Sequence, residues 1–230
     1  MKKTVFYTEL AYLPALALLA IGTALTAYGG FGISMVVAPA YILHLKLSET
    51  LPFFTFGAAG YTLQAVVLLV MMLLLRKVKL VYFLSFVTAV CYGFALDGAM
   101  RIVGLLPEHL LLQLILYVVG NLLCCAGLAL LFSTYLPPET YELFIKNLSV
   151  KLQKPIHTVK TIYDCCSLLL SVLLSLLLFG TIRGIGIGTL ICPFLYGFLI
   201  HAFQHLYGRL FRFTDKFPLR KFFEESECMQ

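Results

Sequence analysis

The stretch VVLLVMMLLLRKVK, which runs from Val66 to Lys79, decides the fold class of this chain. An unbroken apolar run, Val66 to Leu75, is followed at once by a cluster of basic residues. Extended back to Phe53, the run reaches the roughly 20 residues that an α-helix needs to cross the hydrocarbon layer of a bilayer, about 30 Å thick. The stretch therefore predicts a transmembrane helix that ends at a charged interface.

The composition extends this prediction to the whole chain. Of its 230 residues, 61% are hydrophobic and 12% are charged, so too few charged side chains remain to cover the surface of a soluble domain. Further apolar runs, such as Leu110 to Val119 and Leu168 to Gly180, are apolar on every face, whereas barrel strands alternate in polarity over about 10 residues. We therefore predict an all-α, polytopic transmembrane helical bundle that has the lipid bilayer as a partner.

Charged or proline-bearing breaks divide the chain into six predicted spans. They lie near Leu10 to Tyr28, Phe53 to Leu75, Leu80 to Val103, Leu110 to Phe132, Thr161 to Gly180 and Ile185 to His205. Two shorter segments that contain proline remain, Gly29 to Ser48 and Pro137 to Ser149, and neither is well suited to form a complete transmembrane span. The start of the chain imitates a signal peptide, but we interpret its apolar run as the first span.

The basic residues predict the orientation of the spans. With the N-terminus inside, only Lys46, Arg101 and Arg183 of the 17 basic residues fall outside, as the positive-inside rule requires. We therefore expect both termini in the cytoplasm, with residues 209–230 as a charged cytoplasmic tail. The net charge of +6 does not indicate nucleic acid, because the basic residues lie at the ends of apolar runs and form no single patch.

Short matches between the two halves of the chain indicate an internal repeat. They pair Tyr92-Gly93-Phe94 with Tyr196-Gly197-Phe198 and Leu47-Ser48 with Leu148-Ser149. We predict an N-terminal membrane repeat over residues 1–104 and a C-terminal one over 105–208, each with a short proline-bearing segment after its first span. Three spans per repeat is an odd number, so the two repeats should be inverted in the membrane, as in many secondary transporters.

Glycine and proline mark candidate hinges or points of close packing. A second similarity, between Gly30-Phe31-Gly32-Ile33 and Gly184-Ile185-Gly186-Ile187, crosses the order of the repeat, so we interpret it as convergence. Glycine lets the backbone bend and approach closely, and proline frees a carbonyl group. No βαβ unit surrounds these glycines, which excludes a nucleotide loop. The candidates are Gly30, Gly32, Pro39, Pro138, Gly184, Gly186, Gly188 and Pro193.

Several segments resemble a known family. They are GISMVVAPAYILHLKLS (Gly32 to Ser48), YGFALD (Tyr92 to Asp97), YLPPETY (Tyr135 to Tyr141), VKTIYD (Val159 to Asp164) and GIGIGTLICPFLYGFLI (Gly184 to Ile200). This pattern is similar to the YczE/YyaS/YitT group of bacterial integral membrane proteins, closest to its YczE branch. Where that family has a Ser-Pro-Trp-Asp-like segment, this chain has Ala38-Pro39-Ala40-Tyr41 and lacks the acidic residue. The resemblance implies a transporter-like protein of the bacterial plasma membrane, with export of small organic compounds as one class of activity.

Charged residues inside the spans are candidates for a substrate or proton-coupling site. A carboxylate near the middle of a span costs about 2.5 to 3.5 kcal/mol on insertion scales, so it is a functional hypothesis by default. Asp97 lies in the third span with Arg101 one turn later, and the repeat offset aligns them with His201 and His205. We expect these four side chains to face the interior and approach one another. The alternative is that Asp97 and Arg101 form an ion pair near the outer interface.

Other polar residues have simpler interpretations. Gln64 lies well inside the second span and is a further site candidate, although such amides most often join helices. Asp164 is expected to pair with Lys160 at the interface, with a substrate role as the alternative. Glu139 and Glu142, in the second short segment, are expected to lie in water, with a position facing the substrate as the alternative.

The inverted-repeat plan favours a small-solute transporter that works by alternating access. A non-transporting accessory subunit is the alternative, and an intramembrane enzyme is disfavoured because the spans contain no nucleophile and base, HExxH or paired-aspartate motif. We predict no catalytic residues, no cofactor and no metal site, since the seven cysteines show no CxxC or Cys/His metal spacing. The substrate, the coupling ion and any homo-oligomeric state do not follow from the sequence.

Cysteine labelling tests this topology. In a background without the seven native cysteines, a membrane-impermeant thiol reagent applied to intact cells should modify Arg183→Cys and miss Lys151→Cys. Both variants should react after the membrane is permeabilised. Labelling of Lys151→Cys alone in intact cells would reverse the predicted orientation.

Overall fold

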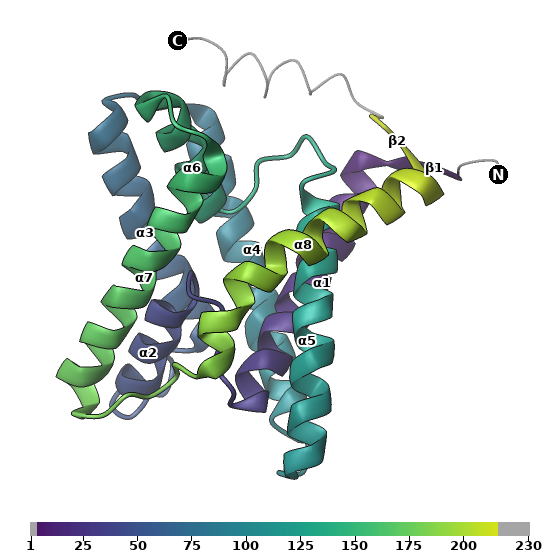
Figure 1. The fold of residues 1–230 in the computed structure, drawn as a ribbon. Helices are drawn as coiled ribbons and strands as arrows, with labels where there is room; N and C mark the ends of the chain where they lie inside the picture. The colour runs from purple at the N-terminus through teal and green to yellow at the C-terminus, as the bar shows by residue number, and fades with distance from the viewer. Residues whose placement is uncertain (1–3, 216–230) are drawn as a thin grey trace.

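The computed structural model describes residues 4–215, except for the side chains of Ile156, His157, Pro193 and Arg212. Within this range the chain is nearly all helical, as predicted (Figure 1). The elements are β1 (Thr4–Tyr7), α1 (Thr8–Gly29), α2 (Ala38–Leu47), α3 (Phe56–Leu75), α4 (Leu80–Val103), α5 (Leu110–Leu131), α6 (Thr140–Leu152), α7 (Ile156–Phe179), α8 (Ile187–Leu210) and β2 (Phe211–Thr214).

Five helices in the described range are long and apolar enough to cross a membrane, namely α1, α3, α4, α5 and the Thr158–Phe179 part of α7. The sixth predicted span falls on α8, which has 24 residues. The two short segments form α2, of 10 residues, and α6, of 13 residues. At 1.5 Å per residue these helices extend about 15 and 20 Å, less than the roughly 30 Å of hydrocarbon. Neither is long enough to cross alone.

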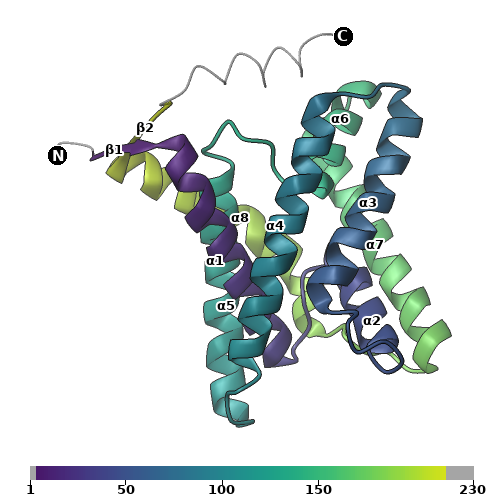
Figure 2. The same ribbon diagram turned by 180° about the vertical axis from the view of Figure 1, so that it is seen from behind.

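The long helices alternate in direction along the molecule (Figures 1 and 2). From the end that holds β1, α1 runs to the opposite end, where α2 lies, and α3, α4 and α5 follow in alternating directions. α6 lies near the end that holds the strands. α7 runs from there toward the end that holds α2, and α8 returns toward the strands. β1 pairs in parallel with β2, with Thr4 opposite Phe211, so the first and last described elements meet. Residues 216–230 of the predicted tail lie outside the described residues.

Small residues let α1 occupy the centre of the bundle. Of its apolar stretch 61% is buried, compared with 22% in α7. A Cβ added at Gly22 would lie 2.7 Å from the carbonyl oxygen of Gly120 in α5, and one added at Gly127 would lie 2.9 Å from that of Ala15. Such small residues allow close backbone approach, which drives helix association in lipid because packing there depends on van der Waals contact.

The start of α3 is capped by α4. The carboxylate of Asp97 accepts hydrogen bonds from the Thr55 hydroxyl at 2.6 Å and from the Gly57 N–H at 2.7 Å. A carboxylate is favourable there because a helix N-terminus carries unpaired N–H groups and a positive partial charge. A Cβ added at Gly57 would overlap the carbonyl oxygen of Gly93. The two helices are thus joined by a cap and by a glycine contact.

The start of α8 packs on the connection between α1 and α2. The N–H of Gly188 donates to the carbonyl oxygen of Phe31 at 3.0 Å, and a Cβ added at Gly186 would overlap that same oxygen. Gly32 has a φ of 107°, which favours glycine, and its added Cβ would lie 2.7 Å from the Gly186 nitrogen. The two glycine motifs that resemble each other in sequence therefore contact each other.

The remaining hinge candidates lie at the ends of helices. Gly30 follows α1 and Gly184 precedes α8, and both have a φ of 73°. Pro39 lies in the first turn of α2, where proline is tolerated because the N–H has no helical partner. Pro138 precedes α6. The side chain of Pro193, in α8, lies outside the described residues.

α7 stands partly away from the rest of the bundle. It packs against α2 and α6, whereas α3, the helix at the corresponding place in the first predicted repeat, packs along α4. Much of the surface of α7 is apolar and exposed, including Leu169, Leu173 and Leu177. Such a surface suits lipid contact in a membrane.

The α3–α4 contact predicts a matched pair of substitutions in one helix. Gly57→Ala places a Cβ into the Gly93 carbonyl group, so it should lower the free energy of unfolding by about 1 to 3 kcal/mol. Gly60→Ala is the control, because a Cβ at Gly60 meets nothing within 4 Å; it should be neutral or slightly stabilising. Thermal unfolding of both purified variants in detergent measures the difference, and equal stability would contradict the close contact.

Candidate functional site

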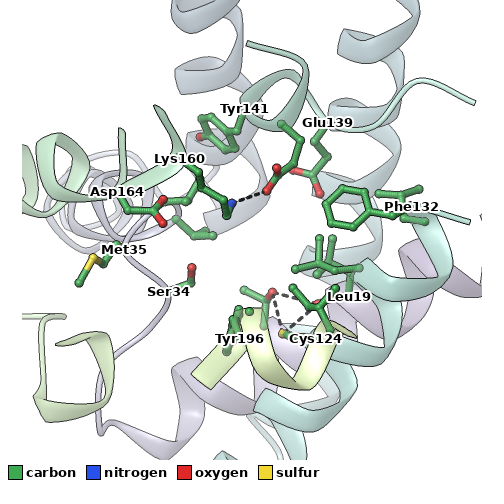
Figure 3. A pocket seen from close by; sticks show the side chains of 18 of the residues that line it. Leu19, Ser34, Met35, Cys124, Phe132, Glu139, Tyr141, Lys160, Asp164 and Tyr196 are labelled. Atoms are coloured by element: carbon green, nitrogen blue, oxygen red, sulfur yellow. Dashed lines mark hydrogen bonds and ion pairs between the residues drawn. The ribbon is translucent and has the colours of Figure 1, made fainter. Parts of the chain in front are cut away.

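A cavity of about 340 Å³ lies between α7 and α8 and is the candidate site (Figure 3). Its walls also come from α1, α4, α5, α6 and the connection before α2. Its size is at the lower end of the range for small-molecule pockets, about 300 to 1,000 Å³. Figure 3 shows Glu139, Tyr141, Lys160 and Asp164 on one side, and Leu19, Cys124 and Tyr196 across from them. The cavity therefore has a charged end and an apolar end.

An ion pair joins α6 to α7 at the charged end. The Lys160 ammonium lies 2.8 Å from a carboxylate oxygen of Glu142. The side chain of Glu142 is 18% exposed and that of Lys160 is 38% exposed, so the pair is partly open to solvent. Surface pairs contribute little to stability, and partial exposure keeps this one in the modest range.

Asp164 lies one helical turn beyond Lys160, on the cavity wall. Only 9% of the residue is exposed, and among the described residues its Oδ1 atom has no hydrogen-bond partner. The buried hydroxyl of Tyr141, also on the wall, has none either within the described part of the chain. Buried polar atoms without partners are rare in folded proteins, so each one needs an explanation.

Glu139 is buried at the same end and is held by Gln64. The Gln64 amide donates from Nε2 to a Glu139 oxygen at 2.8 Å, and its Oε1 accepts the N–H of Thr140 at 3.0 Å. Burial raises the pKa of the Glu139 carboxyl above its ordinary value of 4.5; the Gln64 hydrogen bond lowers that pKa and the nearby Glu142 raises it further. The buried carboxyl thus joins the start of α6 to the middle of α3.

Two tyrosines line the apolar end, and both come from the repeated Tyr-Gly-Phe motif. Tyr92 of α4 donates from its hydroxyl to Thr23 of α1 at 2.9 Å. Tyr196 of α8 donates to the Asn121 side-chain oxygen of α5, also at 2.9 Å. Because each hydroxyl donates to a neighbouring helix, each ring is fixed against the cavity wall. The repeated motif was the sequence signal for these positions.

The structure does not bring together the four charged candidates from the sequence. Asp97 contacts Thr55 and Gly57 at the start of α3, while Arg101, His201 and His205 are exposed. The expectation that all four face the interior is therefore wrong for the last three. Alignment by repeat offset matched positions along the helices, but it did not determine which face of each helix is buried.

The structure also corrects the interpretation of the short acidic segment. Glu139 was expected in water and is buried, because the side chain of Gln64 reaches the start of α6. Lys160 was expected to pair with Asp164, but its hydrogen bond is to Glu142. Gln64, predicted as a site candidate, is 1% exposed and joins two helices through Glu139. The proximity of Glu142 and Lys160 had no signal in the sequence.

Metal-ligating side chains do not gather in the described range. Among the residues searched, no group of three or more His, Cys, Asp or Glu residues could hold a metal ion. Two carboxyl groups of the cavity, Glu139 and Glu142, are instead hydrogen-bonded to an amide and to an ammonium group. Hydrogen bonding and charge are therefore what this site offers a ligand.

The fold and the cavity define a nearly all-helical protein with five helices apolar enough to span a membrane and a pocket between α7 and α8. A family model described as a family of unknown function (DUF6198) matches residues 6–205. The chain therefore belongs to the DUF6198 family. No curated protein and no solved structure matches it.

Burial of Glu139 predicts a pH dependence of stability. Because its pKa is raised when folded, the native protein keeps a proton that the unfolded chain has already lost above the ordinary value of 4.5. The contribution of Glu139 to the free energy of unfolding is fully present below the pKa of the unfolded chain. It is lost as pH rises through the higher pKa of the folded protein. Glu139→Gln is neutral at every pH and should remove this part of the decline.

Melting temperatures in detergent from about pH 4 to 9 measure this effect. Glu108→Gln, a change at an exposed residue, is the control and should keep the wild-type profile. A Glu139→Gln profile parallel to that of the wild type would show that this carboxyl does not control the decline.

Proposed function

We propose that this protein is a small-solute transporter of the bacterial plasma membrane, and that it exposes one central cavity alternately to the two sides. The observation that carries the proposal is the cavity between α7 and α8. In the first half of the chain, the corresponding helices α3 and α4 pack directly against each other. The resemblance to the YczE/YyaS/YitT group implies the same class of activity. Membership of DUF6198 leaves the function open.

Two equivalent contacts support the inverted repeat on which this proposal depends. Tyr92 joins α4 to α1 and Tyr196 joins α8 to α5, which are corresponding helix pairs in the two proposed halves. The short helices α2 and α6 also lie at opposite ends of the molecule (Figures 1 and 2). An inverted arrangement would place them in this way.

The proposed halves differ in one interface, and this difference suggests the mechanism. In the first half, Gly57 and Gly93 are in close contact. The repeat offset of 104 carries these positions to Thr161 and Gly197, which both line the cavity. In the proposed cycle, α7 closes on α8 and α3 separates from α4, so the second half takes the conformation that the first half has now. Exchange of conformations between inverted halves is how such transporters reach both sides.

The orientation follows from the charges. With both termini in the cytoplasm, the end that holds β1, β2 and α6 faces inward (Figure 1). The positive-inside rule favours this, because Lys146 and Lys151 lie on α6. In this orientation the charged end of the cavity is the end nearer the cytoplasm, and a solute entering from inside meets Lys160 and Glu142 first.

A second candidate is a non-transporting accessory subunit. The exposed leucines of α7 favour it, because an apolar helix face in a membrane accepts a partner helix as well as lipid. Purification in mild detergent separates the two functions. Strict co-purification with one membrane protein, together with no solute flux in liposomes, would support the accessory role.

Disulfide trapping tests the proposed cycle. In a background without native cysteines, the pair Thr161→Cys and Gly197→Cys should form a disulfide under mild oxidation in membranes, because the proposed closed state brings these cavity positions together. Ile162→Cys with Gly197→Cys is the control pair, because Ile162 is 58% exposed on α7 and should cross-link far less.

The trapped protein links this conformational change to transport. After reconstitution into liposomes, compounds that stabilise the purified protein against heat should be tested for flux. The disulfide should stop flux, and a reductant should restore it. Failure of the Thr161–Gly197 pair to cross-link above the control, or full flux through the cross-linked protein, would contradict alternating access at this interface.

A further inference from the structure

We infer that the cavity binds small organic amines in their protonated form, with the ammonium group on Asp164 and an apolar body against the opposite wall. The inference rests on the proposed role of the cavity in solute binding and specifies its ligand class. It begins from the one cavity carboxylate that has a buried oxygen without a hydrogen-bond partner among the described residues.

The Asp164 oxygen is an acceptor that the fold leaves available. The residue is 9% exposed and lies on the cavity wall, and its Oδ1 atom accepts no hydrogen bond from the described residues. The nearby Lys160 ammonium does not fill this place, because its hydrogen bond at 2.8 Å goes to Glu142. A buried oxygen of this kind is normally satisfied, so a donor from a ligand is the missing partner. A protonated amine carries such donors and the complementary charge.

The charges around Asp164 select the sign of the ligand. The one ammonium group near Asp164, that of Lys160, forms its ion pair with Glu142, so a single cation is shared by two carboxylates. Glu139 adds a third carboxyl group to the same end and is hydrogen-bonded to the neutral amide of Gln64. With Asp164 ionised, the charged end is therefore negative whether or not Glu139 is protonated. An anionic solute would be repelled, and a cation would be attracted.

The opposite wall selects an apolar body. Leu19 lies on that wall (Figure 3), and Leu128, Phe132 and Phe194 also line the cavity; none of these side chains can hydrogen-bond to a hydroxyl-rich solute such as a sugar. The tyrosine hydroxyls at this end already donate to Thr23 and Asn121. A body of one aromatic ring or a short alkyl chain fits a volume of about 340 Å³, and aromatic walls also attract an ammonium group.

A series of three probes that share one phenylethyl body tests the inference. The full-length protein in lipid nanodiscs is titrated with 2-phenylethylamine, 2-phenylethanol and 3-phenylpropionate, and binding is measured by calorimetry. We expect the amine to bind at least ten-fold more tightly than the alcohol, and the carboxylate to bind least. Equal binding of amine and alcohol, or no measurable binding of the amine, would overturn the inference.

Variants of Asp164 assign the charge recognition to this residue. Asp164→Asn keeps the shape and removes the charge, so it should weaken amine binding at least ten-fold and leave the alcohol unchanged. Asp164→Glu restores a carboxylate and should recover part of the affinity, which guards against a variant that fails only because it misfolds. Glu108→Gln removes an exposed acid and should bind like the wild type. Wild-type amine affinity in a folded Asp164→Asn variant would overturn the assignment.

Failure of this inference and failure of the proposed function give different results. If the amine binds through Asp164 but no amine crosses liposome membranes containing the protein, the ligand assignment stands and transport is wrong. If the Thr161–Gly197 disulfide controls flux of other solutes and the amine does not bind, transport stands and the ligand class is wrong.

Discussion

A carboxylate inside an apolar helix bundle needs a donor, and this constraint organises the structure. Outside water, each unpaired carboxylate costs several kcal/mol, so acids are placed where another helix can hydrogen-bond to them. Asp97 of α4 accepts from the start of α3, and Glu139 before α6 accepts from Gln64 of α3. Glu142 of α6 accepts from Lys160 of α7. These bonds join α4, α3, α6 and α7 in succession.

Asp164 departs from this pattern, and the departure is what singles out the cavity. Its neighbours on α6 and α7 are satisfied by each other, yet one of its own oxygens has no partner among the described residues. Selection for stability alone would favour either a hydrogen-bond donor to this Asp164 oxygen or a residue other than an acid at this position. Proteins keep such unsatisfied groups where function requires them and offset their cost elsewhere.

The sequence was enough to predict the helices, because apolar length alone identifies a potential span. The run from Val66 to Leu75 falls inside α3, as predicted. The short helices were located by their prolines, since Pro39 and Pro138 mark the starts of α2 and α6. The β1–β2 pairing was not predicted, because each strand has four residues and joins opposite ends of the chain.

The site was predictable only in part, because burial of a polar residue depends on contacts between distant segments. Gln64 was a candidate from its position inside a span. Its partner Glu139 is 75 residues away, and nothing near Glu139 in the sequence indicates that it is buried. His201 and His205 show the opposite error, since the repeat aligned them with Asp97 but they lie on the exposed face of α8. Position along a helix follows from sequence, whereas the buried face follows from packing.

The same carboxylates suggest how the two proposed gates are coupled. In the proposed cycle, opening of the α3–α4 interface must accompany closing of α7 on α8, so something must connect α3 to α7. α6 contacts both helices. It is joined to α3 through Gln64 and Glu139, and to α7 through Glu142 and Lys160. In that cycle, a displacement of α3 that carries Gln64 with it would pull on the start of α6, and the ion pair would carry that displacement to the cavity wall.

Glu139 would make this coupling sensitive to protons. Its pKa is raised by burial, and a movement that admits water would lower that pKa again, so the carboxyl would release its proton when the α3–α6 contact opens. The same linkage acts in reverse. Because opening of the α3–α6 contact would lower the proton affinity of Glu139, loss of the Glu139 proton would favour the open contact. The proton would occupy Glu139, just before α6, and the organic cation would occupy Asp164 of α7, and both carboxyl groups line the same cavity.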